Sequence, residues 1–516
     1  MYNNIKMILN VYKQEIKKGA LSCSNIGFKI WCIIITAIAL CFTFFCSDGF
    51  AGARVEYIIW VSVGLAAIIL LCIYCFFKVN FHIFSFLFIV VLGGMLVLIQ
   101  PILNVPDESA HFTRAELLSR GVFVIDPDLQ VFETIEGVKD IEDNREKTYV
   151  QSNIKGVNID YSSAESLNIA ASNTSIIYIP QSIGIKIAKL LNLDVIWLLW
   201  GARGVNLLFY ALLIMFSIKI APKLKMLIFF VATLPMSIQQ AASCSPDAFI
   251  NGMAILLFAY FLYMHQMAEK SIKLRNMASF FLIGVLLTIA KVTNIFFVGL
   301  ILLIPNLNFR SKRMAYLIKT GIIIATCIAG GAHYLYSTSF APSLTQVKYL
   351  EQTGVDSIKQ IGFILDNFLL WAQNFGKAMI YRLNEYLRML NYFGPFKYGY
   401  EVLAPIFLFT YAKICYQEDG IKIKFISKIL VFLMALGIYF VTCFAMYLSW
   451  TGVGALTIEG VQGRYFIPML MLCVLLFTSE KFDIGSEEKE KKHVVDISII
   501  SIMLSSMLIT IVSYYY

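Results

Sequence analysis

Long runs of apolar residues divide this chain, and they constrain its fold more than any other feature. A helix that crosses a bilayer needs about 20 mainly apolar residues. The sequence holds about thirteen such runs, at 29–46, 57–77, 81–100, 196–218, 226–243, 248–267, 277–290, 292–305, 314–337, 401–415, 429–449, 465–480 and 495–516. Backbone polar groups in lipid must be satisfied within the chain, which favours helices. The runs predict an all-α polytopic membrane protein with about 13 transmembrane helices, within a range of roughly 11–14.

The composition excludes a large soluble catalytic domain. Only 15% of the 516 residues are charged, whereas soluble domains average about 25%. The net charge of +9 does not indicate nucleic-acid binding, because the Lys and Arg residues gather in short connections between apolar runs. Basic residues in such connections orient a membrane protein.

The same basic connections predict the topology. Lys and Arg concentrate around 219–225, 270–275, 310–313, 413–428 and 481–492. These connections fall on one side if thirteen spans alternate, and the positive-inside rule makes that side cytoplasmic. The N-terminus is then cytoplasmic, and the C-terminus lies outside the cytoplasmic membrane.

Two long polar segments interrupt the series of spans, and both fall on the extracytoplasmic side. In the second, apolar residues recur at helical spacing over 361–390, which predicts an interfacial amphipathic helix. The predicted divisions are a cytoplasmic basic N-terminus at 1–28, three spans within 29–100, an extracytoplasmic loop with an acidic motif at 101–195, central spans within 196–337, an extracytoplasmic loop with the amphipathic helix at 338–400, and C-terminal spans within 401–516.

Two points about the spans depend on local sequence. The first apolar run is followed by no small-residue cleavage site, so we expect a retained first span. The runs 277–290 and 292–305 are separated only by Lys291. They predict either two short tilted helices or one re-entrant pair.

An acidic motif stands directly after the third predicted span. Asp107 and Glu108 open it, and His111 and Arg114 follow at spacing that brings them close to one helical face. Two carboxylates at a membrane surface suit a general base or a divalent cation. The alternative is an interfacial helix that Asp107 caps and whose charges face water.

Four cations lie at the predicted outer ends of spans, where the positive-inside rule disfavours them: Arg114, Arg203, Lys291 and Arg464. Charges in or beside the membrane are costly and mark substrate paths, and Arg and Lys bind phosphate oxygens. The alternative is that each cation pairs with an acid such as Asp247 or Glu459, or extends to lipid headgroups.

Two further segments bring polar residues to the predicted outer face. Ser245-Pro246-Asp247 forms a short connection, so Asp247 either supports the acidic motif or simply starts a helix. The segment from Gly460 to Pro468 opens the twelfth predicted span and carries Arg464.

Three motifs together resemble the family of bacterial predicted membrane proteins called domain of unknown function 2142, which is related to the GT-C glycosyltransferases. They are Pro106-Asp107-Glu108-x-x-His111-Phe112-x-Arg114, Leu234-Pro235 to Ser245-x-Asp247, and Gln462-Gly463-Arg464-Tyr465-Phe466-x-Pro468. The resemblance implies a GT-C-like arrangement of the spans. It also implies a polyprenyl-phosphate-linked sugar as a substrate, used outside the membrane.

By this resemblance Asp107 and Glu108 match the acidic pair and are the predicted catalytic residues, or ligands if a divalent cation is present. The predicted substrate- and phosphate-binding residues are His111, Arg114, Tyr178, Arg203, Asp247, Lys291, Gln462, Arg464 and Tyr465. The expected partners are the lipid-linked sugar, an envelope glycan or lipid-linked acceptor, and membrane lipids.

Three functions compete at this stage. The first is a glycosyltransferase that modifies a cell-envelope glycan or polymer in polysaccharide biosynthesis. The second is a transporter or flippase of lipid-linked saccharides, which would carry ionisable residues throughout its spans or paired broken helices. The third is a non-catalytic subunit of an envelope polymer assembly complex. The conspicuous charges gather at one face, which favours the enzyme.

The topology yields the first testable prediction. Cysteines introduced in place of Asp126 and Ser357 should react with a membrane-impermeant thiol reagent added outside, because both positions lie in the predicted extracytoplasmic loops. A cysteine in place of Lys489 should not react. Labelling at position 489 from outside would contradict the whole placement.

Overall fold

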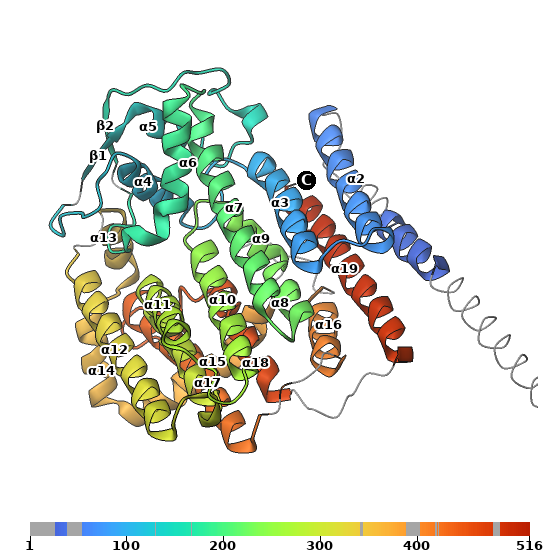
Figure 1. Ribbon diagram of the computed structural model, residues 1–516. Coiled ribbons are helices and arrows are strands. Elements are labelled where there is room, and N and C mark those ends of the chain that lie inside the picture. Colours follow the sequence, from blue (N-terminus) through green and yellow to red (C-terminus); the bar gives the residue numbers. More distant parts are fainter. Residues whose placement is uncertain are drawn as a thin grey trace, which may run out of the picture. The chain divides into compact units, whose positions relative to one another are not determined.

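The computed structural model consists of helices and one small sheet (Figure 1). It describes residues 26–38, 54–129, 131–166, 168–340, 344–388, 403–417, 421, 423–477 and 486–515. The chain separates into two compact units, one made of Met1–Asn80 with Asp483–Tyr516 and the other of Phe81–Phe482. Most of the predicted basic N-terminus at 1–28, and the end of the first predicted span beyond Ile38, lie outside the described residues.

The described residues of the first unit form three helices, which come from the two ends of the sequence. They are a helix at Ile26–Ile38, α2 (Arg54–Phe76) and α19 (Ser486–Tyr515). The Thr36 and Ser501 hydroxyl oxygens lie 2.8 Å apart, and Lys29 Nζ donates to the Cys75 carbonyl at 2.8 Å. Hydroxyl contacts of this kind join helices where water is scarce.

Six helices among the described residues are long and apolar enough to cross a membrane. They are α3 (Phe81–Ile99), α7 (Ile196–Ile220), α10 (Asp247–His265), α12 (Lys312–Thr338), α17 (Phe425–Ser449) and His493–Ile511 within α19. Shorter apolar helices are Ile26–Ile38, Val61–Phe76, α11 (Leu274–Ala290), η4 (Val292–Leu303) and Pro405–Cys415 within α16 (Leu403–Gln417). The predicted helical, polytopic character is confirmed, and the count of thirteen spans stays a prediction.

Two predicted spans are broken in the structure, and a third region forms a pair of short helices. The run 226–243 forms α8 (Lys225–Ala232) and α9 (Pro235–Ala241), because Pro235 lacks the N–H that would continue a helix. The run 465–480 forms η7 (Gly463–Phe466) and α18 (Met469–Phe477). The pair 277–290 and 292–305 forms α11 and the 3₁₀ helix η4, which pack together where Gly284 faces Val298.

The polar segment 101–195 is folded rather than extended. It contains α4 (Glu108–Ser119), β1 (Phe132–Ile135), α5 (Glu136–Glu142), η2 (Tyr149–Gln151), β2 (Ser163–Ser166), η3 (Ser175–Tyr178) and α6 (Ile179–Leu190). β1 pairs antiparallel with β2, with Phe132 opposite Ser166. This sheet departs from the all-α expectation. Leu117, Ile125, Phe132 and Ile169 form a small core beneath it.

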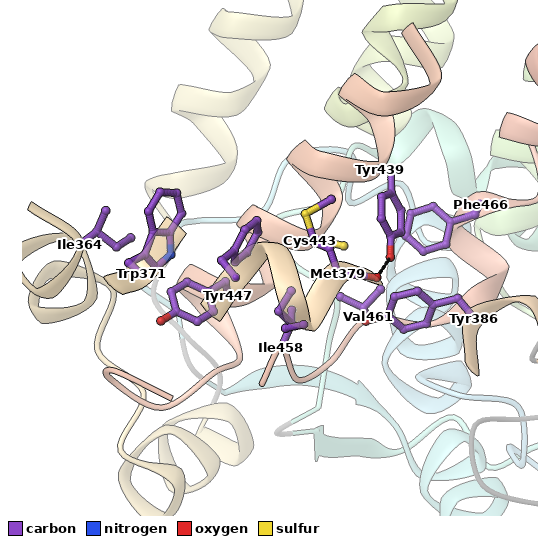
Figure 2. Close-up of a cluster of buried hydrophobic side chains, with 12 residues drawn as sticks. Ile364, Trp371, Met379, Tyr386, Tyr439, Cys443, Tyr447, Ile458, Val461 and Phe466 are labelled. Atoms are coloured by element: carbon purple, nitrogen blue, oxygen red, sulfur yellow. Dashed lines mark hydrogen bonds between the residues drawn. The ribbon is translucent and has the colours of Figure 1, made fainter. Parts of the chain in front are cut away.

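The polar segment 338–400 is largely helical, although 389–400 lies outside the described residues. Its helices are α13 (Leu344–Thr353), α14 (Ser357–Asp366) and α15 (Phe368–Arg388), and the short η5 (Asn306–Asn308) precedes α12. One face of α15 packs on α17, where Tyr439 Oη donates to the Met379 carbonyl at 2.7 Å (Figure 2). Leu369, Ile380 and Tyr381 on α15 are 82%, 79% and 85% exposed. The helix thus carries apolar side chains on an exposed face as well as on its packed face, and its interfacial position stays a prediction.

A glycine contact sets the spacing between the polar segment and the membrane helices. Helix α6 runs beside α7 (Figure 1), and Gly184 of α6 meets Gly201 of α7. A Cβ added at Gly184 would collide with the Gly201 carbonyl. Only glycine lets two backbones approach so closely.

This contact generates a prediction about stability. Gly184→Ala should lower the free energy of unfolding by about 1–3 kcal/mol, because the methyl group forces the helices apart. Gly204→Ala on the facing helix α7 is the control, since its added Cβ meets nothing within 4 Å. Thermal unfolding of both purified variants measures the difference, and equal melting temperatures would contradict the role of the contact.

Candidate functional site

Arg464 brings the three sequence motifs together. Its Nη2 atom lies 2.9 Å from Asp107 Oδ2, and its Nη1 atom lies 3.3 Å from Asp247 Oδ2. The Arg464 side chain is only 4% exposed, whereas that of Asp107 is 57% exposed. A buried guanidinium therefore anchors a carboxylate that remains open to solvent.

The backbone at Asp107 differs from the sequence-based expectation. Asp107 precedes α4 with φ 63° and ψ 8°, in the left-handed region, and its side chain caps no backbone N–H. The predicted helix cap is therefore wrong. Aspartate tolerates this conformation better than most residues. The conformation leaves the carboxylate for Arg464.

Asp247 starts a helix and also joins the site. It is the first residue of α10, after Pro246, and its N–H donates to Ser245 Oγ at 3.1 Å. Its side chain is 10% exposed. Asp247 therefore both starts a helix and lies with the acidic motif, because the helix start places its carboxylate beside Arg464.

Gln240 is a residue of the site that the sequence reasoning missed. Its Oε1 accepts a hydrogen bond from Arg464 Nη1 at 3.2 Å. Gln240 lies on α9, fully buried next to Gln239. Two adjacent glutamines inside an otherwise apolar run were the available signal, because buried amides need partners.

Lys291 and Tyr465 complete the cationic side of the cluster. Lys291 ends α11, and its Nζ lies 3.6 Å from the centroid of the Tyr465 ring. The Arg464 guanidinium carbon lies 5.3 Å from the same ring. A ring face stabilises a cation without neutralising it. Within the described part of the chain, no ion pair involves Lys291.

Glu108 lies next to Asp107 in sequence but in a different environment. Its Oε1 accepts from Arg203 Nε at 2.8 Å and its Oε2 from Arg203 Nη2 at 2.7 Å, and both side chains are fully buried. The Cys244 N–H adds a hydrogen bond to Oε1 at 3.0 Å. Arg203 Nη1 and Nη2 also donate to the Gln100 and Pro101 carbonyls. This geometry leaves no access for a substrate and favours a structural role for the pair.

His111 forms a neutral contact behind the carboxylates. Burial lowers the pKa of His111 to about 4, although the nearby Asp107 carboxylate raises it. The imidazole is therefore uncharged at neutral pH. Asn173 Nδ2 donates to Tyr178 Oη at 2.8 Å, and this oxygen lies 2.7 Å from His111 Nδ1. The Tyr178 hydroxyl proton is thus free to bond the imidazole, and the contact joins α4 to the η3 segment.

Two predicted binding residues lie apart from these contacts. Arg114 is 2% exposed and donates to the Val122 and Phe123 carbonyls and to Ser175 Oγ, so it holds the polar segment together. Gln462 precedes η7, half-buried, and its carbonyl accepts from the Tyr465 N–H at 3.1 Å. Arg114 therefore acts within the polar segment rather than at the exposed carboxylate.

Among the described residues, the acidic motif does not belong to a group of metal ligands. Within the described ranges, no group of three His, Cys, Asp or Glu side chains could hold a metal ion. Asp107 is engaged by Arg464 and Glu108 by Arg203. The expected divalent cation thus has no set of ligands here, and no chemical step is routed through it.

Comparison with known proteins identifies the family. The sequence profile described as predicted membrane protein, domain of unknown function 2142, matches residues 87–473. The chain belongs to this family. All the residues of the Arg464 cluster lie within the matched region. The family expected from the three motifs is confirmed.

Two further comparisons add less. No curated protein matches the chain. Among solved structures, a crystal structure of ArnT from Cupriavidus metallidurans bound to undecaprenyl phosphate is similar, with 12% sequence identity over 84% of this chain and 77% of that chain and a TM-score of 0.38. A TM-score below 0.5 does not establish a shared fold.

The contrast between the two neighbouring acids generates a prediction. Glu108→Gln should lower the free energy of unfolding by about 3–5 kcal/mol, because it leaves the Arg203 charge buried without a counter-charge. Asp107→Asn should change stability far less, since its side chain is exposed. Thermal unfolding of both variants in the same detergent tests this. Equal losses would show that the Glu108 pair is no more important for folding than the exposed acid.

Proposed function

We propose that this chain is a membrane glycosyltransferase that uses a polyprenyl-phosphate-linked sugar to modify a cell-envelope glycan or polymer. In this proposal the chain lies in a bacterial cytoplasmic membrane, with thirteen spans in a GT-C-like arrangement and a cytoplasmic N-terminus. The Arg464 cluster then faces the extracytoplasmic side.

The observation that carries the proposal is the exposed carboxylate of Asp107 on a buried guanidinium. Arg464 engages Asp107 Oδ2 at 2.9 Å, and the side chain is 57% exposed. A carboxylate that is oriented but accessible suits a general base. Asp107 would take the proton of an acceptor hydroxyl. The oxygen of that hydroxyl would at the same time attack the anomeric carbon of the donor sugar. The carbon–oxygen bond to the phosphate breaks, and the polyprenyl phosphate leaves with the electron pair.

Lys291 supports the binding of the leaving phosphate. Among the described residues its ammonium has no ion-pair partner, and it rests on the Tyr465 ring next to Arg464. An ammonium without a counter-ion is a ready partner for phosphate oxygens. Arg464 is already shared between Asp107 and Asp247. Its main role in this proposal is therefore to orient the base.

An apolar groove supports a lipid-linked donor. The groove has a volume of about 560 Å³, and its lining includes Ile179, Pro180, Phe249 and Met253. The first two residues follow Tyr178 directly, and the other two lie in the first and second turns of the helix that Asp247 begins. An apolar groove that adjoins a polar cluster suits a ligand with a hydrocarbon tail and a charged head.

The proposal predicts the effect of removing the base. Asp107→Asn should reduce sugar transfer by ~10²–10⁴-fold at equal protein level, because the amide keeps the size of the side chain and cannot accept the proton. The exposed Asp128→Asn is the matched control. The measurement is the rate of transfer in membranes of a deletion strain that carries each variant, together with its lipid-linked intermediates.

The intermediates distinguish the competing functions. Under the proposal, the deletion strain and the Asp107→Asn strain accumulate the same saccharide lipid lacking one sugar. A complete saccharide lipid trapped inside would contradict the transferase and favour a flippase. Full activity of Asp107→Asn would rule out this residue as the base.

A further inference from the structure

We propose that a groove between α15 and the segment 450–462 binds the acceptor, and that this acceptor is a saccharide carrying an anionic group. The inference rests on the proposed transferase function, because it assigns a second substrate to the same reaction. Neither the family nor the comparisons assign a role to this groove.

The groove is large enough for more than one sugar residue and has mixed walls. Its volume is about 510 Å³, and it is lined by Lys377, Tyr381, Arg382 and Glu385 of α15 and by Leu456 and Thr457 opposite them. Charged and hydroxyl groups thus alternate with apolar surface. Binding sites use a few placed polar groups for orientation and specificity.

Packing and ion pairs fix the polar side chains. Arg382 Nη1 lies 3.0 Å from Glu385 Oε2, and Arg382 Nη2 lies 3.0 Å from Glu459 Oε1. Thr457 Oγ1 donates to Glu459 Oε1 at 2.9 Å. Behind them, Met379 and Tyr386 of α15 are buried in the hydrophobic cluster of Figure 2. One wall of the groove is therefore a helix that packs on the core, and the ion pair between Arg382 and Glu459 ties the other wall to it.

The exposed apolar groups fit a sugar ring. Tyr381 is 85% exposed and Leu456 is 68% exposed, although both line the groove. Sugar rings present C–H groups on their faces and hydroxyl groups at their edges. An aromatic ring covers such a face, while Arg382, Glu385 and Thr457 offer donors and acceptors to the hydroxyl groups.

Lys377 indicates that the saccharide carries a negative charge. Its ammonium lines the groove and is exposed, and no ion pair involves it within the part of the chain that the structure describes. Arg382, in contrast, is balanced by two carboxylates. Lys377 is thus the cation of the groove lining that pairs with no described carboxylate, and a carboxylate or phosphate on the saccharide would pair with it.

The chain segments that form the groove also adjoin the Arg464 cluster. Thr457 and Arg464 belong to the same short segment before α18. The Tyr386 ring of α15 lies 5.5 Å from the Phe466 ring of η7, which is the element that carries Arg464. A saccharide in the groove would therefore lie against the segment that orients Asp107.

Binding of defined oligosaccharides to the full-length protein in phosphatidylcholine nanodiscs tests this inference. The probes are a hyaluronan tetrasaccharide, which carries carboxylates, and the neutral chitotetraose. Calorimetry measures the affinity of each probe. We expect tighter binding of the acidic probe. Tyr381→Ala should weaken both probes at least tenfold, and Lys377→Gln should weaken only the acidic one by at least fivefold.

The controls separate this inference from the proposed reaction. Tyr316→Ala and Lys359→Gln change exposed residues of the same types on α12 and α14, and they should leave both affinities unchanged. Asp107→Asn should also leave binding intact, even if transfer is lost.

Three results would overturn the inference. They are no binding of either probe, affinities unchanged in both groove variants, and equal binding of the two probes. Adding phosphatidylglycerol to the nanodiscs tests for a lipid headgroup site. If that lipid displaces the probe and its own binding depends on Lys377 and Tyr381, the groove is a lipid site and the inference is wrong.

Discussion

The buried ion pair between Glu108 and Arg203 holds the polar segment against the membrane helices. It joins the start of α4 to the middle of α7, and the Cys244 N–H joins the same carboxylate just before α10. Two fully buried charges are stable only when each is paired and hydrogen-bonded. Any movement of α4 would break these contacts at once. The position of Asp107, one residue before Glu108, therefore depends on this buried ion pair.

The two adjacent acids have different roles because a helix begins between them. Glu108 is the first residue of α4 and points toward α7, whereas Asp107 has a left-handed backbone and points toward Arg464. Arg464, near the end of the family match, in turn pairs with Asp107 near the start of the match and with Asp247 in its middle. Lys291 adds a cation on the Tyr465 ring. The cluster thus keeps one accessible carboxylate beside one available ammonium.

Sequence reasoning was most successful where a property belongs to a single segment. The apolar runs, the amphipathic pattern of α15 and the motif residues Asp107, Asp247 and Arg464 were all apparent from composition and spacing. It failed where the outcome depended on a partner distant in sequence. Asp107 was expected to cap a helix, but its side chain pairs with Arg464, which is 357 residues away. Gln240 had no assigned role for the same reason.

The sequence by itself determined a helical, polytopic membrane protein, because burial in lipid leaves few choices for the backbone. It also identified the polar motif residues that stand at the ends of the apolar runs. Only the tertiary structure decided which charges meet. Glu108 pairs with Arg203, Arg114 donates to carbonyl groups of its own polar segment, and Arg464 joins two carboxylates. The physical reason is that a buried charge requires a partner, and which partner it finds depends on how distant helices pack.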